Sequence, residues 1–219
     1  QMGIPAGQSA HILTGLDPSC RYSLKGTANA GTAPYTNRWT LFELLGADSL
    51  RSAHSIGCLT NDPAQGVTLE SNQVAICTGT NTSAGAMFDW EDVIPGTGGQ
   101  IIIISRKYTG PVPNGTNNLT AGIFGLGGLR LEETFRPMSI TWQSPGAMLM
   151  PGSPYTFEVV TKGTGPVSYQ WRKDGIDIPY ATNSTYPISS VATNDSGVYS
   201  VLVSNPESSI LSSNAELIV

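Results

Sequence analysis

Short apolar or alternating stretches recur along the chain, separated by clusters of Gly, Pro, Asn and Ser. A period of two is typical of half-buried β-strands, and turn residues at this density are typical of all-β folds. In the first 135 residues the pattern predicts strands at about 10–13, 22–28, 38–44, 54–59, 73–77, 86–90, 100–105 and 128–131. Helical periodicity is scarce: the best candidate, residues 39–50, also reads as a strand that ends at Gly46-Ala47-Asp48. The sequence therefore predicts an all-β protein.

Two stretches refine this pattern. The run Ile101–Ile104 has no alternation, which predicts a central strand with both faces covered. Residues 109–118 are polar and rich in Gly, Pro and Asn, so we expect an exposed loop, a common place for binding.

A different pattern occupies the last third of the chain. Trp171 lies in the predicted strand Tyr169–Lys173, which runs into a tight turn at Asp174-Gly175. A later turn, Asp195-Ser196-Gly197, leads to Tyr199. A buried Trp on one strand and a tyrosine corner on a later strand are typical of immunoglobulin-type sandwiches. We expect Trp171 between two sheets and the Tyr199 hydroxyl bonded to backbone just upstream.

With these motifs, residues 138–219 resemble bacterial I-set-like immunoglobulin modules. The resemblance places Val159 and Val201 at the two cysteine positions of antibody domains, so apolar packing replaces the disulfide between the sheets.

A second resemblance covers residues 8–133. Leu13-Thr14-Gly15-Leu16-Asp17-Pro18 before Tyr22-Ser23-Leu24, together with the segments 99–104 and 128–132, resembles extracellular bacterial modules of the galactose-binding or malectin-like kind. This likeness implies a jelly-roll-like sandwich. The composition changes at residues 134–137, which predicts a jelly-roll-like domain over 1–135 and an immunoglobulin-like domain over 138–219.

Composition narrows the class of protein. Only 12% of the 219 residues are charged, the net charge is -5, and Lys and Arg form no cluster, which argues against nucleic-acid binding. No apolar run approaches the length of a membrane span. The polar, weakly charged composition suits a secreted or assembled protein. We therefore expect an extracellular or cell-surface location, with any signal peptide already removed.

Reactive residues are few. Cys20, Cys58 and Cys77 allow either one disulfide with a free thiol or three thiols, and they form no zinc-binding spacing. His11 and His54 are far apart in sequence, and the spacing of Cys58 from His54 on a strand is poor for a catalytic pair. We predict no catalytic residue, no cofactor and no enzymatic activity.

Several residues remain candidates for binding. Asp89, Glu91 and Asp92 are weak candidates for a calcium site, with an ordinary polar strand end as the alternative. Trp39 and Trp90 are candidate platforms for sugar stacking, although most Trp residues of a small sandwich belong to its core. Trp142 is a third such candidate. Asn114 and Asn118 are the best placed of five N-x-S/T glycosylation sequons.

We interpret the chain as a non-enzymatic extracellular structural protein, a self-associating subunit of a filament or coat. Sheet edges or the N-terminal arm Gln1–Gln8 would make the contacts between copies. Two alternatives stay open: a carbohydrate-binding or adhesion module of a secreted protein, and a phage decoration or tail protein.

Overall fold

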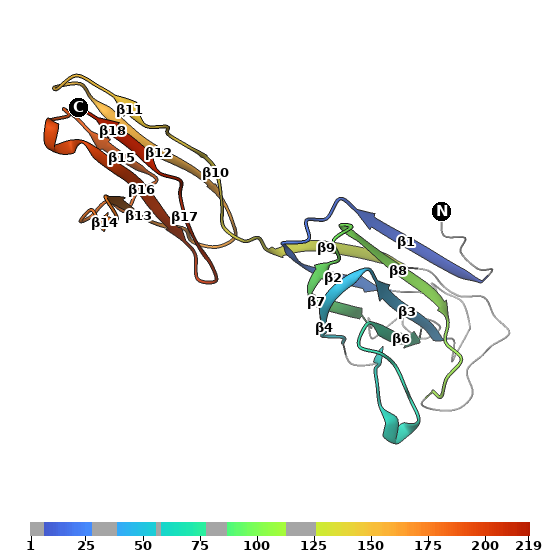
Figure 1. Ribbon diagram of the computed structural model, residues 1–219. Coiled ribbons are helices and arrows are strands. Elements are labelled where there is room, and N and C mark those ends of the chain that lie inside the picture. The colour runs from blue at the N-terminus through green and yellow to red at the C-terminus, as the bar shows by residue number, and fades with distance from the viewer. Residues whose placement is uncertain (1–6, 28–38, 56–57, 78–86, 113–125) are drawn as a thin grey trace. The chain divides into compact units, whose positions relative to one another are not determined.

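A computed structural model describes residues 7–27, 39–55, 58–77, 87–112 and 126–219 (Figure 1). The chain is all-β, apart from two single-turn 3₁₀ helices in the described part, and it divides into two compact units, 1–134 and 135–219.

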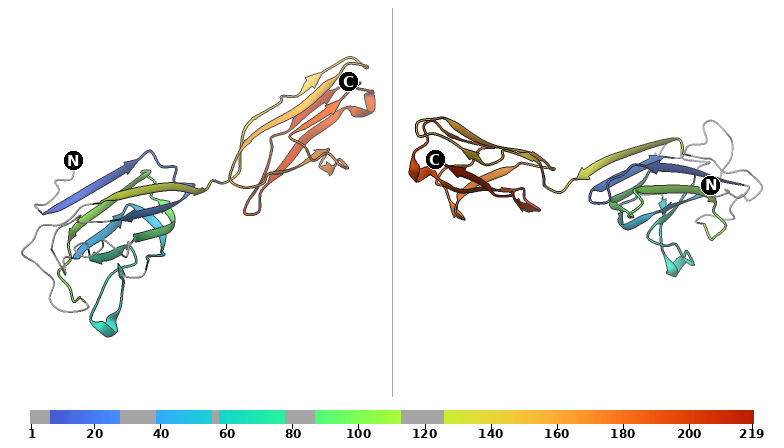
Figure 2. Two further views of the ribbon diagram at one scale, coloured as in Figure 1. Left: turned by 180° about the vertical axis from the view of Figure 1, so that it is seen from behind. Right: turned by 45° about the horizontal axis from the view of Figure 1, so that its top comes forward.

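The first unit is a sandwich of two sheets, visible from two further directions in Figure 2. One sheet has the strand order β1-β8-β3-β6-β5 and the other has the order β4-β7-β2-β9. The strands are β1 (Gln8–Thr14), β2 (Arg21–Thr27), β3 (Trp39–Leu45), β4 (Ala47–Ser52), β5 (Cys58–Leu59), β6 (Gln73–Cys77), β7 (Met87–Pro95), β8 (Gln100–Lys107) and β9 (Gly128–Phe135), and η1 spans Pro63–Gln65.

The strand order resembles that of a jelly roll. The first strand lies beside the eighth in one sheet, and the second lies beside the seventh in the other, so successive strands wrap around a shared core. Two departures are visible: β5 pairs with β6 and not with β4, and β9 extends the second sheet beside β2.

Aromatic rings fill the space between these sheets. Phe88 lies between Phe42 and Trp90, with ring centroids 5.1 and 4.8 Å away. A Cβ at Gly26 would overlap the Phe88 ring, so the absence of a side chain there makes room for it. Ile101 and Ile103 of β8 are fully buried in the same core, and Ile102 on the opposite face is 8% exposed. Both faces of this strand are thus covered, although β3 is the middle strand of the five.

A smaller apolar cluster covers the outer face of the five-stranded sheet. Trp39 and Leu41 of β3 point away from the main core and pack with Val67, Leu69 and Tyr108 from the connecting segments. The connection that contains η1 therefore folds against the sheet.

The structure corrects two expectations in this unit. A strand was predicted over 54–59, but among the described residues of that range, 54–55 and 58–59, strand is limited to Cys58–Leu59. Ala47–Ser52 forms a strand that the pattern did not predict. The Ala47–Ser52 segment is mostly polar and follows Gly46, which made it resemble a turn. Residues 39–45 form a strand and not a helix, because β6 and β8 pair with both of its edges.

The second unit is also a two-sheet sandwich (Figure 1). One sheet has the order β10-β12-β15 and the other has the order β11-β18-β16-β13-β14, with β17 also paired to β16. The strands are β10 (Ser139–Gln143), β11 (Ala147–Met148), β12 (Tyr155–Lys162), β13 (Ser168–Lys173), β14 (Ile176–Asp177), β15 (Thr185–Ile188), β16 (Gly197–Ser204), β17 (Ser209–Leu211) and β18 (Ala215–Ile218), and η2 spans Thr193–Asp195.

The expected signature residues form its core. Trp171 is 3% exposed and donates its indole N–H to the Asn183 carbonyl at 2.9 Å. The Tyr199 ring stacks on Phe157 at 4.3 Å between centroids, and its hydroxyl donates to the Asp195 carbonyl at 2.8 Å, forming the tyrosine corner.

A tight turn and a pair of buried valines also match the expected immunoglobulin pattern. Asp174 and Gly175 both have positive φ, +51° and +80°, as a two-residue type I′ hairpin between β13 and β14 requires. Val159 and Val201 are both buried in one core cluster, in the place where antibody domains carry their disulfide.

Candidate interaction surfaces

His54 and Cys58 do not form a catalytic pair of base and nucleophile. His54 Nδ1 accepts the Asp89 backbone N–H at 3.0 Å, and burial lowers the pKa of His54 to about 4. The Cys58 thiol donates to the Met87 carbonyl at 3.5 Å, and burial raises its pKa to about 11. A neutral imidazole and an un-ionised thiol with separate partners are poorly suited to nucleophilic catalysis.

The other candidates for redox or metal chemistry lie apart. None of the three cysteines Cys20, Cys58 and Cys77, all within the described residues, forms a disulfide, and Cys20 is fully buried. Cys58 packs against the core between the sheets, whereas Cys77 packs into the outer cluster, so their side chains lie on opposite faces of one sheet. His11 is exposed on β1. Within the described ranges, no three His, Cys, Asp or Glu side chains are grouped so that they could hold a metal.

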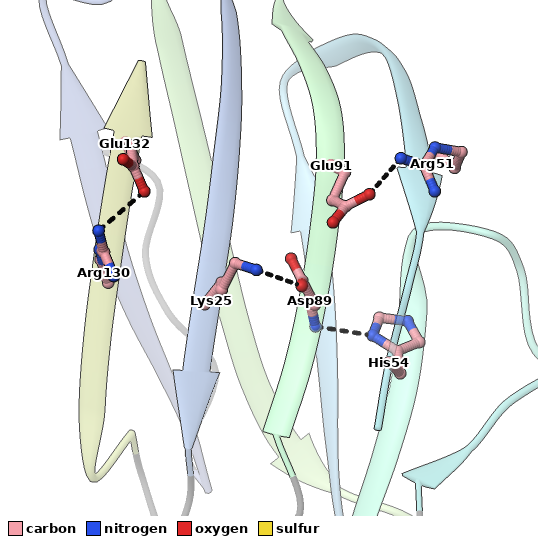
Figure 3. A network of polar contacts seen from close by, with 7 residues as sticks. All are labelled: Lys25, Arg51, His54, Asp89, Glu91, Arg130 and Glu132. Atoms are coloured by element: carbon pink, nitrogen blue, oxygen red, sulfur yellow. Dashed lines mark hydrogen bonds and ion pairs between the residues drawn. The ribbon is translucent and has the colours of Figure 1, made fainter. Parts of the chain in front are cut away.

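The acidic residues beside Trp90 belong to a network of ion pairs on the four-stranded sheet (Figure 3). Lys25 of β2 binds the Asp89 carboxylate at 2.8 Å, and Arg51 of β4 binds both Glu91 and Asp92. Because each carboxylate already has a cationic partner, the three do not converge as calcium ligands.

Asp89 is unusual within this network. The residue is only 8% exposed, and its Oδ1 is buried without a hydrogen-bond partner. Lys25 is therefore the charge that keeps this carboxylate from being an unpaired buried ion.

The two tryptophans expected to stack against sugars are buried inside the first unit. Trp90 has no exposed surface and Trp39 is 7% exposed, so neither ring offers an open face to a ligand. Trp142 of the second unit is 49% exposed. Asn114 and Asn118 lie outside the described residues.

The sheet edges differ in how they are protected from strand addition. Charged side chains occupy β9 at Arg130, Glu132 and Glu133, and Pro187 interrupts the β15 edge. Charge and proline are the usual devices that prevent pairing with another chain.

By contrast, β1 has seven residues and carries neither Lys, Arg, Asp, Glu nor Pro. It pairs with β8 along its whole length, and no described strand pairs with its other edge. Ile12, beside that edge, is 56% exposed. An uncharged, regular edge with an exposed apolar side chain is suited to contact with another chain.

The class of the second unit follows from its strand order, its tyrosine corner and a family match. Residues 137–205 match the family described as Immunoglobulin domain. This unit is therefore an immunoglobulin-like domain. The match spans less than half of the chain, so it assigns this domain alone.

One curated relative is the "Decoration protein" of Escherichia phage T5, which is 44% identical over 55 residues, 25% of this chain and 34% of the relative. The matched part thus spans about a third of the relative's length.

One similar solved structure is Titin M4, which is 20% identical. The match covers 39% of this chain and 97% of Titin M4, with a TM-score of 0.36. Another is the N-terminal four immunoglobulin domains of Dscam1 isoform 8.4, which is 17% identical and matches 95% of this chain and 40% of its own, with a TM-score of 0.37.

These comparisons do not support the resemblance of residues 8–133 to galactose-binding modules. The jelly-roll assignment of the first unit depends on its strand order. No helix in the described part of the chain is both long and apolar enough to cross a membrane.

Pattern reasoning from the sequence missed the contrast between protected and open edges. A strand was predicted over 10–13, within the stretch Gln8–Thr14 that forms β1. That it lies at a sheet edge depends on its pairing with β8, some 90 residues later, which no local pattern encodes.

Proposed function

We propose that this chain is a non-enzymatic structural protein of a virus-particle surface, with the jelly-roll unit making contacts and the immunoglobulin-like domain attached to it. The observation that carries the proposal is the 44% identity over 55 residues to a phage decoration protein. Jelly rolls are common in viral capsids, which agrees with this role for the first unit.

The contact that we assign to the first unit is strand addition at the free edge of β1. A neighbouring strand would pair with the main chain of Gln8–Thr14, and Ile12 would be covered by that neighbour. The neighbour is a second copy of this chain or a coat subunit.

The first test is to purify particles from the source that encodes this chain and to quantify its peptides by mass spectrometry. A fixed, stoichiometric ratio to the major coat protein is expected. Absence from purified particles, together with a monomer at every concentration in light scattering, would refute a structural role.

Two variants then test the contact. Ile12→Lys places a charge beside the β1 edge. Ile176→Lys, at an isoleucine of β14 that is 74% exposed against 56% for Ile12, is the matched control. We expect only the first substitution to prevent rebinding of the protein to particles that lack it, or its self-association. Equal behaviour of the two variants would exclude the β1 edge as the contact.

A further inference from the structure

Two strands of the immunoglobulin-like domain run side by side and then separate. Ala147 and Met148 of β11 pair in parallel with Leu217 and Ile218 of β18. Four residues earlier, at the same sequence offset, the Gln143 side chain replaces the main chain. Its amide donates to the Ser213 carbonyl and accepts the Ser213 N–H, both at 3.0 Å.

Beyond Gln143, no described main-chain pairing joins β10 to β17. An open cleft of about 410 Å³ lies between them, and its walls include Ile140 and Trp142 on one side and Ile210 and Leu211 on the other.

The main chain of β17 faces this cleft in a regular way. Ser212 donates its N–H to Val201 of β16, and Ile210 lies opposite Val203. Because the bonded positions of an antiparallel pair alternate, the N–H and C=O groups of Ser209, Leu211 and Ser213 point away from β16. The Gln143 amide already occupies the Ser213 position, as a peptide group of an added strand would. Leu211, the next outward-facing residue of this edge, lines the cleft, and Ser209 follows on the same edge just beyond the lining.

The surface around the cleft is apolar and uncharged. Trp142, Leu211 and Val160 are 49%, 51% and 45% exposed, and Val160 lies directly opposite Trp142 in the neighbouring strand. Neither 139–143 nor 208–213 contains a charged residue. A charged ligand would find no counter-ion here, whereas an uncharged apolar segment would bury exposed surface on both sides.

We propose that the cleft between β10 and β17 binds an extended, uncharged strand of a partner protein, which pairs with the main chain of Leu211 and Ser209 and packs apolar side chains against Trp142. The alternating side chains of such a strand place every second residue against the apolar walls. This site is independent of the proposed particle role, because it uses neither β1 nor any residue of the first unit.

The test uses the full chain and a capped peptide of alternating valine and threonine. The peptide is neutral, extended and able to form main-chain hydrogen bonds. Titration followed by NMR should shift the amide signals of Ser209, Leu211 and the Trp142 indole, and the exchange of the Leu211 N–H with solvent should slow at least tenfold. A peptide with N-methyl groups on the amides of its pairing edge should lose at least tenfold in affinity, because it cannot pair along that edge.

Two single substitutions provide a second test of peptide binding. Leu211→Lys should weaken peptide binding at least tenfold, whereas Met150→Lys, at a residue 79% exposed outside the cleft, should leave binding unchanged. Native near-ultraviolet circular dichroism of both variants shows that the fold is retained.

Three outcomes overturn the proposal: no peptide binding at millimolar concentration, signal shifts confined to other surfaces, or equal binding of the N-methylated peptide. Binding of neutral oligosaccharides at Trp142 without peptide binding would assign the cleft to glycans. Concentration-dependent self-association that Leu211→Lys abolishes, without peptide binding, would assign it to a second copy.

Discussion

The tyrosine corner allows a quantitative test of what stabilises the immunoglobulin-like domain. Tyr199→Phe removes the hydroxyl that donates to the Asp195 carbonyl at 2.8 Å, but it keeps the ring stacked on Phe157. One neutral hydrogen bond contributes about 1 kcal/mol to the free energy of unfolding. Tyr199→Ala also removes a ring that is only 2% exposed, and we expect it to cost about 3–5 kcal/mol.

The pH dependence of this loss gives a second test. Burial raises the pKa of Tyr199 to about 12, above the value of about 10 expected in the unfolded chain. The protonated hydroxyl therefore contributes fully below pH 10, and its contribution is lost as the pH rises towards 12. The difference between wild type and Tyr199→Phe should narrow over this range.

Amide hydrogen exchange of Val201 and Val203 reports the opening free energy of this domain alone, because both residues lie in its core. A loss below about 0.3 kcal/mol for Tyr199→Phe at pH 7 would show that the hydroxyl bond contributes nothing. A difference that stays constant from pH 10 to 12 would contradict the assigned titration.

Three further predictions concern the first unit. His54→Asn keeps an acceptor for the Asp89 N–H but removes the titrating ring. Because the pKa of His54 is lowered to about 4, the wild type should lose stability as the pH falls from about 6.5 to 4. In urea titrations over this pH range, the wild type should lose about 1–2 kcal/mol more unfolding free energy than the variant. This figure is smaller than the full pKa shift implies, because the ring is partly exposed to solvent. Gly46→Ala should cost about 2–4 kcal/mol in the same assay, since φ is +81° and a Cβ would collide with the Gln100 carbonyl; an unchanged midpoint would contradict this. Lys25→Met should lower the urea midpoint by leaving Asp89 unpaired, and adding Asp89→Asn should recover much of the loss; a double variant no better than the single one would exclude the ion pair as the cause.

Local signals sufficed for the parts of the fold that depend on neighbours in sequence. Asp174-Gly175 predicted a turn because both positions require positive φ, and the spacing from Asp195 to Tyr199 predicted the corner. The β8 run from Ile101 predicted a covered strand because its lack of alternation reflects burial on both faces.

The remainder depended on contacts that are distant in sequence. The polar Ala47–Ser52 segment is a strand because β7 pairs with it, across bulges that break any regular alternation. Trp90 was a candidate sugar platform because its aromatic face suits a sugar ring, yet the ring is fully buried between the two sheets. Its acidic neighbours pair with Lys25 and Arg51 of the adjacent strands. The cleft beside Trp142 needs two strands some 70 residues apart, so the sequence alone could not reveal it.

The parallel pairing of β11 with β18 also has a mechanical consequence. The chain enters this domain at Phe135 and reaches Val219 directly after β18, so the two paired strands connect to opposite ends of the domain. A pull between those two residues loads the β11–β18 hydrogen bonds in shear, all at the same time. Peeling, which breaks one bond after another, needs less force. Under tension the domain should therefore yield in one abrupt step, with the Gln143–Ser213 contact adding to the bonds that share the load.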